Sequence, residues 1–391
     1  MIVTPIAHRI GLDAHLLNLS GNYRSAGINW YIYHLLQHLT PSHDLAYTVF
    51  LSEPNAHTHF KHLAIAQSRL PTHKPSVRIF WEQCIQPLAL YRAKIDLLHA
   101  LAFAGPVASS IPWIATVYDL SFVRYPQSFH RANRIYLTWA VRHAVRHARR
   151  IIAISASTRR DLIERFGASP ERVVVVYCGA DPAFTAVRHE PAIAELRTRY
   201  NLPAKMILHV GTIEPRKNLV RLIHAFARAK RAAHLPHQLM LVGARGWKYA
   251  EVDAAIEHAG VTNEVRLVGY VPQAELPLWY QAADLFVYPS LYEGFGLPPL
   301  DAMASGVPVI TSNAASLPEV AGDAALQIEP TDLAALTDAI VRVLTEPNLR
   351  AQMIERGMRQ AQKFSWAQAG QETMTLYRTV LSETKLEFGK Y

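Results

Sequence analysis

The chain has 391 residues, of which 50% are apolar and 18% are charged; this is the balance of a globular protein too long for one comfortable core. It has no apolar run long enough to cross a bilayer, and residues 1–15 lack a basic segment followed by a long apolar one, so we expect neither a membrane-spanning helix nor a secretory signal. A formal charge of +9, from 40 Lys and Arg against 31 Asp and Glu, favours anionic partners but does not choose among nucleotides, lipid head groups and nucleic acid.

Cysteine and histidine usage argues against metal and disulfide chemistry. Cys84 and Cys178 lie far apart without CxxC spacing, so neither a disulfide framework nor a cysteine zinc site is indicated, and we expect a reducing, cytoplasmic setting. The 19 histidines are scattered without HExxH spacing. We therefore expect no metal site and no bound cofactor.

Short β-branched runs alternate with longer helical patterns from about residue 9 onward, which is typical of βα units that build parallel sheets. In the first half we expect strands at 9–14, 47–52, 77–80, 97–101, 113–118, 150–155 and 173–177. In the second half we expect them at 206–210, 238–242, 265–268, 284–288, 307–311 and 325–328. The boundary falls near residue 185, and the tail that begins near SWAQAGQ is a long helix with no strand after it.

Open α/β sheets bind ligands beyond the carboxyl ends of their strands, so candidate residues are sought there. In RSAGINWYIYHLLQHL, Gly27 precedes an amphipathic helix and either brings an amide towards phosphate or merely begins the helix. In TVYDLSFVRYP, Asp119 follows a strand and either contacts a sugar or serves as a turn residue.

The segment RANRIYLTWAVRHAVRHARR, residues 131–150, predicts a helix with apolar positions 137, 141, 144, 145 and 148 on one face and Arg or His on the other. The favoured interpretation is a helix that packs on the core and exposes a basic face to solvent. The alternative is peripheral contact between this basic face and an anionic membrane surface.

A strand, a loop and a helix are predicted in LHVGTIEPRKNLVRLIHAF, residues 208–226. The strand runs into Gly211, and Asn218 is a suitable N-cap for the helix. Arg216 and Lys217 then lie at a strand's carboxyl end and just before a helix N-terminus, which is a favourable place for phosphate. A solvated basic loop is the alternative.

The stretch SLYEGFGLPPLDAMASG, residues 290–306, follows another strand and predicts a loop and a helix with two prolines in its first turn. Gly294 and Gly296 allow main-chain amides to approach a ligand. Glu293 in the loop and Asp301 one turn into the helix bracket an anion-binding helix end, an arrangement that suits a sugar at one side of a diphosphate and a ribose at the other. Taken singly, each acid could instead cap the loop or the helix start.

Together, GTIEPRKN, VRLVGYVPQAEL and DLFVYPSLYEGFGLPPLDAMASGVPVITSNAASLPEVAGDAAL resemble the retaining nucleotide-sugar glycosyltransferases of family 4, especially bacterial mannosyltransferases that build O-antigen-type polysaccharides. FWEQ, DLLHA, AISASTRRDL and YCGAD also fit the family order, so the resemblance covers nearly the whole chain. It implies a GT-B fold: two Rossmann-like, doubly wound parallel-sheet domains that face each other across a cleft. We expect an acceptor-side domain over 1–184, completed by helix 373–391, and a donor-binding domain over 185–372.

The resemblance also implies roles for individual residues. Arg216 and Lys217 would bind the diphosphate and stabilise the leaving nucleotide, Glu293 would hold the donor sugar, and Asp301 would hold the ribose. Further donor-binding residues are Gly27, Gly211, Thr212, Gly243, Arg245, Val271, Ser290, Gly294, Phe295, Gly296 and Leu297, while Tyr118 and Asp119 would lie on the acceptor side. The chain departs from the family pattern at Asp301, usually glutamate, and at Tyr118, usually histidine.

The expected function is metal-independent, retaining transfer of a hexose, mannose from GDP-mannose, to a glycan or lipid-linked glycan acceptor in cell-surface polysaccharide synthesis. The expected place is the cytoplasm, with a peripheral position at the inner face of the cell membrane as the alternative. A UDP-sugar-dependent transferase, a nucleotide-sugar epimerase and a sugar phosphorylase are alternatives on the same fold. A non-enzymatic nucleotide or nucleic-acid binder is a further alternative, which would need a basic patch with interleaved aromatic residues.

Overall fold

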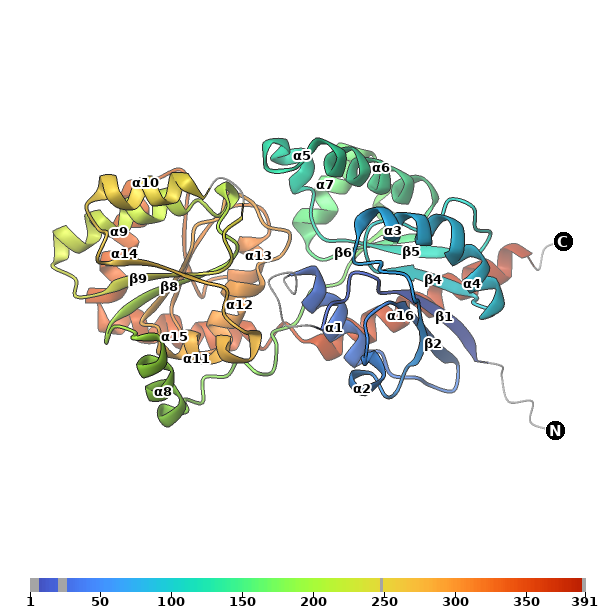
Figure 1. Cartoon of the computed structure of the whole chain (residues 1–391), viewed down its shortest axis with the longest axis horizontal. Coiled ribbons are helices and arrows are strands. Elements are labelled where there is room, and N and C mark those ends of the chain that lie inside the picture. Colours follow the sequence, from blue (N-terminus) through green and yellow to red (C-terminus); the bar gives the residue numbers. More distant parts are fainter. Residues whose placement is uncertain (1–6, 20–26, 247–248, 389–391) are drawn as a thin grey trace. The chain divides into compact units, whose positions relative to one another are not determined.

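The computed structural model describes residues 7–19, 27–246 and 249–388 (Figure 1). The chain divides into two compact units. Unit 1 contains residues 1–124, 129–179 and 366–391, and unit 2 contains residues 125–128 and 180–365. These bounds differ from the predicted halves, because the chain changes unit after residue 179 rather than 184 and returns to unit 1 at 366 rather than 373.

Unit 1 is built on a seven-stranded parallel sheet with the order β3-β2-β1-β4-β5-β6-β7. The strands are β1 (His8–Asp13), β2 (Leu45–Leu51), β3 (Ala64–Gln67), β4 (Leu97–Ala100), β5 (Trp113–Val117), β6 (Arg150–Ala153) and β7 (Val173–Val175). The order turns back between β1 and β4, as in other doubly wound sheets.

The helices of unit 1 are α1 (Ile28–His38), α2 (Ala56–His59), α3 (Pro75–Phe80), a π-helical turn (Trp81–Ile85), α4 (Gln86–Arg92), α5 (Ser121–Arg124), α6 (Arg131–His147), α7 (Ala156–Phe166) and α16 (Trp366–Phe388). Within the described ranges, no helix is both long and apolar enough to span a membrane.

One strand predicted for unit 1 was wrong, and one strand of the sheet was missed. The strand expected at 77–80 is helical, because this segment begins a helix that runs through α3, the π-helical turn and α4. Its buried residues Trp81, Gln86 and Leu90 recur at helical spacing, which the short apolar run VRIF alone did not reveal. The short edge strand β3 was not predicted, since its sequence AIAQ carries little β-branched character.

Helix α16 completes unit 1. Gly370 packs against α1 so closely that a Cβ atom there would lie 2.6 Å from the backbone oxygen of His38. Farther along, the buried Tyr377 hydroxyl lies 2.6 Å from Nδ1 of His99 on β4, whose Nε2 lies 2.8 Å from the Thr116 hydroxyl on β5. Burial lowers the pKa of His99 to about 3, so its ring is neutral and links helix to sheet as one donor and one acceptor. Figure 1 shows α16, in red, alongside α1.

Unit 2 is built on a six-stranded parallel sheet with the order β10-β9-β8-β11-β12-β13. Its strands are β8 (Met206–Val210), β9 (Gln238–Val242), β10 (Val265–Gly269), β11 (Leu285–Tyr288), β12 (Val309–Ser312) and β13 (Leu326–Ile328), so all six predicted strands are confirmed. Its helices are α8 (Glu190–Tyr200), α9 (Leu219–Ala233), α10 (Ala250–Ala259), α11 (Leu276–Ala282), α12 (Leu297–Ala304), α13 (Leu317–Ala321), α14 (Leu333–Thr345) and α15 (Pro347–Ala361).

The strand order of unit 2 determines where a ligand can bind. From β8 the chain builds outward through β9 and β10, and it then returns to place β11 on the other side of β8. The loops that follow β8 and β11 therefore leave the same edge of the sheet side by side and diverge. This switch point is the position at which open α/β sheets bind ligands.

The contact between Tyr377 and His99 gives a prediction about stability. Tyr377→Phe removes the hydroxyl and leaves one nitrogen of the buried His99 without its partner, so we expect a loss of roughly 1–3 kcal/mol in the free energy of unfolding. Urea denaturation measures the loss. Tyr91→Phe is the matched control, because Tyr91 is exposed and the same deletion there should change little. Equal stability of the two variants would contradict this account of how α16 is held.

Candidate active site

The loop after β8 carries the two predicted cations. It contains a short 3₁₀ turn, Pro215–Lys217, and then passes through Asn218 into α9. Asn218 has a left-handed backbone (φ 59°) and its side chain does not cap α9, so the predicted capping role was wrong. Its amide instead donates to the Pro289 oxygen (3.1 Å) and the Pro330 oxygen (2.7 Å). It thereby ties the loop after β8 to the loop after β11.

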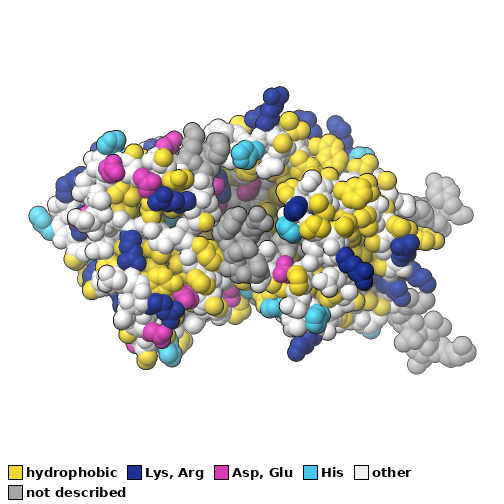
Figure 2. All heavy atoms as spheres, viewed as in Figure 1, with side chains coloured by type: hydrophobic (Ala, Val, Ile, Leu, Met, Phe, Trp, Pro, Cys, Tyr) yellow, Lys and Arg dark blue, Asp and Glu magenta, His cyan; other side chains and the backbone are white. Residues whose placement is uncertain are grey.

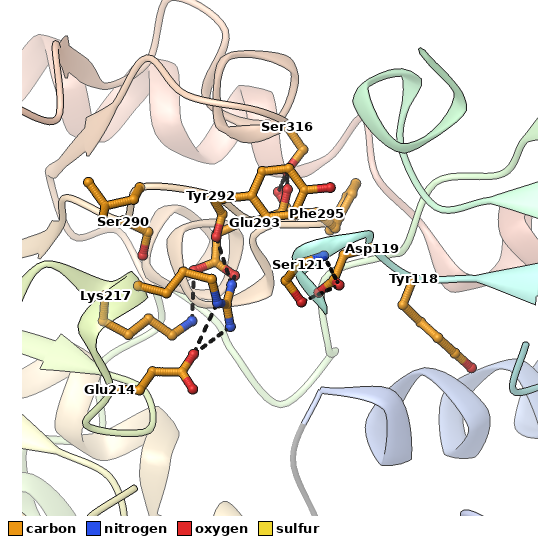
Figure 3. Close-up of polar contacts among 12 residues, drawn as sticks. Tyr118, Asp119, Ser121, Glu214, Lys217, Ser290, Tyr292, Glu293, Phe295 and Ser316 are labelled. Carbon is orange, nitrogen blue, oxygen red and sulfur yellow. Dashed lines mark hydrogen bonds and ion pairs between the residues drawn. The ribbon is translucent and has the colours of Figure 1, made fainter. Parts of the chain in front are cut away.

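Glu293, in the loop after β11, contacts both cations, and Figure 3 shows it beside Lys217. Its Oε2 accepts a hydrogen bond from Nη1 of Arg216 and its Oε1 accepts one from Nζ of Lys217, each over 2.7 Å. The residue is only 8% exposed. The structure thus brings together the three residues predicted to be catalytic, Arg216, Lys217 and Glu293.

The charges in this cluster balance. Arg216 also forms an ion pair of 2.7 Å with Glu214, so two acids face two bases. Burial alone would raise the pKa of the Glu293 carboxyl, but Arg216 and Lys217 outweigh burial and hold that pKa at about 2. Burial lowers the pKa of Lys217 despite the nearby Glu293 carboxylate, and the Arg216 charge acts in the same direction. The cluster keeps an ionised carboxylate in a largely water-excluded place.

Sequence reasoning missed three residues of this cluster. Besides Glu214, these are Tyr288, whose hydroxyl accepts from Lys217 Nζ over 2.6 Å, and His209, whose ring stacks on Tyr288 at 5.3 Å between centroids. Burial lowers the pKa of His209 to about 4, and its Nδ1 bonds to the Val287 oxygen (2.9 Å). A polar ring near the end of an otherwise apolar strand was a usable signal for both His209 and Tyr288.

The loop that carries Glu293 is fixed by hydroxyl groups from the adjacent β12 region. The Ser316 hydroxyl lies 2.9 Å from the Glu293 oxygen and 2.7 Å from the Phe295 oxygen, and the Ser312 hydroxyl bonds to the oxygen of the buried Ser290. Helix α12 starts just beyond, with prolines in its first turn as predicted. Gly296 precedes it with φ 114°, and a Cβ there would lie 2.8 Å from a Leu317 methyl.

The loops after β8, β9 and β10 hold five of the predicted donor-binding residues, and most of the others follow β11. A Cβ atom on Gly243 (φ 147°) would lie 2.0 Å from the Gly211 oxygen, so the first two loops touch through their backbones. Next to this contact, Ile213 pairs with Arg245, whose guanidinium lies over the ring of Tyr249. Thr212 lies beside Gly211, and Val271 is buried in the loop after β10. Gly294 and Phe295 directly follow Glu293 in the loop after β11, and Leu297 is the first residue of α12.

Asp301 lies outside the Glu293 cluster. It is one turn into α12, and its Oδ1 atom is buried without a hydrogen-bond partner in the described part of the chain. Burial raises the pKa of Asp301 well above its usual range, and the nearby Asp181 carboxylate raises it further. A hydrogen bond from the backbone amide of Asp181 acts in the opposite direction. Asp301, which is predicted to hold a ribose, therefore has a buried carboxyl oxygen that can still accept a hydrogen bond.

The three predicted site residues in unit 1 differ in their exposure and in their contacts. Gly27 is exposed at the start of α1 with φ 34°. Tyr118 is buried, with its hydroxyl bonded to the Leu101 oxygen. Asp119 accepts from the amide and the hydroxyl of Ser121 (2.8 and 2.6 Å) at the start of α5, which is the turn role considered as its alternative.

Two doubly wound parallel-sheet units, one with an Arg, a Lys and a Glu joined at its switch point, define the GT-B fold. Solved structures support this fold. Sucrose-phosphate synthase from Thermosynechococcus elongatus has a TM-score of 0.76 and 24% identity, covering 96% of this chain and 100% of that one. Anabaena HepE, solved with UDP and glucose, has a TM-score of 0.73 and 20% identity, covering 95% and 100%.

Sequence comparisons define the family. Residues 194–360 match the model described as glycosyl transferases group 1, and residues 25–184 match that of glycosyltransferase family 4. O-antigen chain mannosyltransferase B of Escherichia coli is 34% identical over 270 residues, 68% of this chain and 70% of that protein. The E. coli serotype-specific mannosyltransferase WbdA is 32% identical over 222 residues, 56% of this chain but only 27% of WbdA. The chain belongs to glycosyltransferase family 4.

The low pKa of Glu293 gives a prediction for acid conditions. An acid whose pKa is depressed contributes stability that is present above its unfolded value, near 4.5, and lost as the pH falls through the folded value, about 2. The stability difference between the wild type and Glu293→Gln should therefore shrink by roughly 3 kcal/mol from pH 5 to pH 2. Urea denaturation at a series of pH values measures it.

The control for this series is Glu257→Gln, on the exposed side of α10. Its stability difference from the wild type should hardly change with pH. A difference for Glu293→Gln that is equally flat would contradict the ion pairing described here.

Proposed function

We propose that the chain is a retaining glycosyltransferase that moves mannose from GDP-mannose to a glycan or lipid-linked glycan acceptor. The observation that carries the proposal is the Arg216, Lys217 and Glu293 cluster at the switch point of unit 2. Relatives in Escherichia coli support the sugar, because an O-antigen chain mannosyltransferase and serotype-specific mannosyltransferases are 30–34% identical over more than half of this chain. D-inositol 3-phosphate glycosyltransferases match over a similar share at 30–32% identity, so the sugar is the part that the activity assay must test.

Lys217 and Arg216 are suited to stabilise a departing nucleoside diphosphate. An ammonium group carries three N–H donors, and the described contacts of Lys217 use two of them, to Tyr288 and Glu293. The third is available to a phosphate oxygen. Because the two cations are largely buried and held in place by their carboxylate partners, the negative charge that develops on the leaving group would meet fixed donors in a place of low dielectric constant. The proposal therefore assigns no role to a metal ion.

Glu293 serves this reaction electrostatically. With its pKa at about 2, the carboxyl group is ionised at neutral pH and cannot donate a proton, and both of its oxygens already bond to cations. It is better placed to orient the donor sugar and the two cations than to attack carbon. The acceptor hydroxyl would attack on the face that the diphosphate leaves, and the departing phosphate oxygen would take its proton, which gives retention.

The remaining donor contacts are proposed from the neighbouring loops. The unpartnered Oδ1 of Asp301 can accept a hydrogen bond from a ribose hydroxyl, and a protonated carboxyl group, which the raised pKa of Asp301 favours, keeps this acceptor capacity. Gly211, Gly243 and the backbone around Val271 lie at the same strand ends and would line the nucleotide.

Transfer activity tests these roles. We expect Lys217→Met and Glu293→Gln each to lower kcat/KM by about 100-fold or more, the usual effect of removing one preorganised charged contact from a transition state. Removing one member of a buried ion pair also costs roughly 3–5 kcal/mol of stability, so folding must be separated from catalysis. The double variant removes both charges and should recover stability without recovering transfer.

The control for these variants is Arg228→Met, on the exposed side of α9 in the same unit. It removes a positive charge without touching the cluster and should keep full activity. Full activity in folded Lys217→Met or Glu293→Gln would refute the proposed roles.

The donor nucleotide is tested by thermal shift. A ligand that binds only the folded protein raises the melting temperature by mass action, so GDP should raise it and UDP should not. The same shift should be smaller in Lys217→Met, because one phosphate contact is lost. A response to UDP but not to GDP would overturn GDP-mannose as the donor and favour a UDP-sugar, the class of nucleotide present in the HepE structures.

A further inference from the structure

Unit 1 exposes an apolar stripe along the helix formed by α3, the π-helical turn and α4. Phe80, Cys84, Leu88 and Tyr91 follow one another at helical spacing, and all four are exposed. The exposed fraction is 56% for Phe80 and 79% for Tyr91. The opposite side of the helix packs into the unit. This outward side is therefore left without a partner in the described structure.

Helix α6 and the loop before β5 extend this surface. Ile135 and Trp139, four residues apart on α6, are 58% and 40% exposed, and Val107 is 58% exposed. Two contacts join the three elements: the Tyr136 hydroxyl donates to Glu82 over 3.2 Å, and the Val107 amide donates to the Gln83 side chain over 2.9 Å.

We call this surface the apolar face, defined by Phe80, Leu88, Tyr91, Val107, Ile135 and Trp139. These six are half of the twelve exposed large hydrophobic side chains found among the described residues. Figure 2 shows hydrophobic side chains gathered over α3, α4 and α6. A concentration of this kind marks an interaction surface rather than chance exposure.

Basic residues border the apolar face, and exposed acids are absent from the helices that form it. Residues 75–92 contain one acid, Glu82, which is buried and paired with Arg78 at 3.3 Å, and residues 131–147 contain none. On α6, Arg131 and Arg142 are exposed on the same side as Ile135 and Trp139. On this side of α6, the apolar side chains of Ile135 and Trp139 thus lie between two arginines.

The excess positive charge of the chain lies in the same unit as the apolar face. Unit 1 contains 22 Lys and Arg against 12 Asp and Glu, a formal charge of +10, whereas unit 2 contains 18 against 19, a charge of −1. The excess positive charge therefore belongs entirely to the unit that carries the apolar face. Two copies of such a face would repel each other, which argues against self-association through it.

We propose that the apolar face docks on the surface of an anionic lipid bilayer. Its aliphatic and aromatic side chains would enter the boundary between head groups and acyl chains, where Trp and Tyr are favoured, and the bordering arginines would pair with lipid phosphates. A nucleic acid would fit poorly, because the centre of the face offers aliphatic groups rather than hydrogen-bond donors. The basic side of 131–150, for which membrane contact was the alternative interpretation of the sequence, supplies only the border.

This inference goes beyond sugar transfer and does not depend on the identity of the donor. It would bring unit 1 to the place where a lipid-linked acceptor lies, if the proposed function holds. Its test uses vesicle binding alone, so failure of the membrane contact and failure of the transfer proposal are distinguishable.

The experiment is co-sedimentation of the full chain with vesicles of phosphatidylcholine and with vesicles that also contain phosphatidylglycerol. We expect binding to the anionic vesicles, weakened by salt, and little binding to phosphatidylcholine alone. Leu88→Ser combined with Tyr91→Ser should weaken binding about tenfold or more through lost apolar insertion. Arg131→Glu combined with Arg142→Glu should also weaken binding about tenfold or more, because the new carboxylates are repelled by the anionic lipids.

Matched controls lie in unit 2, where Val187→Ser replaces an exposed apolar residue and Arg228→Glu reverses an exposed arginine. Both should bind like the wild type. The proposal is overturned if the wild type does not bind anionic vesicles, or if the unit 1 variants bind as well as these controls. It is also overturned if Leu88→Ser with Tyr91→Ser changes the mass measured by analytical ultracentrifugation without changing vesicle binding, which would assign the face to a protein contact.

Discussion

The buried ion pairs of Glu293 with Arg216 and Lys217 are the contacts on which the rest of the site depends. Each residue is costly to bury alone, and the cluster is stable because every charge meets an opposite one at 2.7 Å. These pairs also join the loop after β8 to the loop after β11. Backbone contacts from serine and asparagine side chains then hold both loops in place, so the charges stay fixed before a ligand arrives.

The topology explains why these two loops meet. Strands β8 and β11 are far apart in the chain but adjacent in the sheet, and their loops diverge from a shared edge. The apolar runs of unit 2 predicted its strands correctly, because strands buried on both faces have continuous hydrophobic sequences. In unit 1, the run at 77–80 looked like a strand, but it begins a helix whose buried positions, Trp81, Gln86 and Leu90, all come after the run.

The site was predictable to a similar extent. Charged residues between a strand end and a helix start pointed to Arg216, Lys217 and Glu293, since the spacing needs no knowledge of tertiary contacts. Their partners were harder to predict. The only signal for Tyr288 was a polar ring at the end of an apolar strand, and Glu214 is assigned by side-chain direction, which the sequence pattern does not give. Asn218 was misjudged for the same reason, and the residue beside Asp301, Asp181, comes from a segment 120 positions earlier in the chain.

The two units divide the physical tasks, with a balanced charge cluster in unit 2 and an excess of positive charge in unit 1. The central claim is that the cluster is built to receive a nucleoside diphosphate. A crystal structure with bound GDP tests it most directly. A β-phosphate oxygen within about 3 Å of Lys217 Nζ and in contact with Arg216 is the expected result. A nucleotide bound elsewhere, with the pairs to Glu293 unchanged and no phosphate near Lys217, would contradict it.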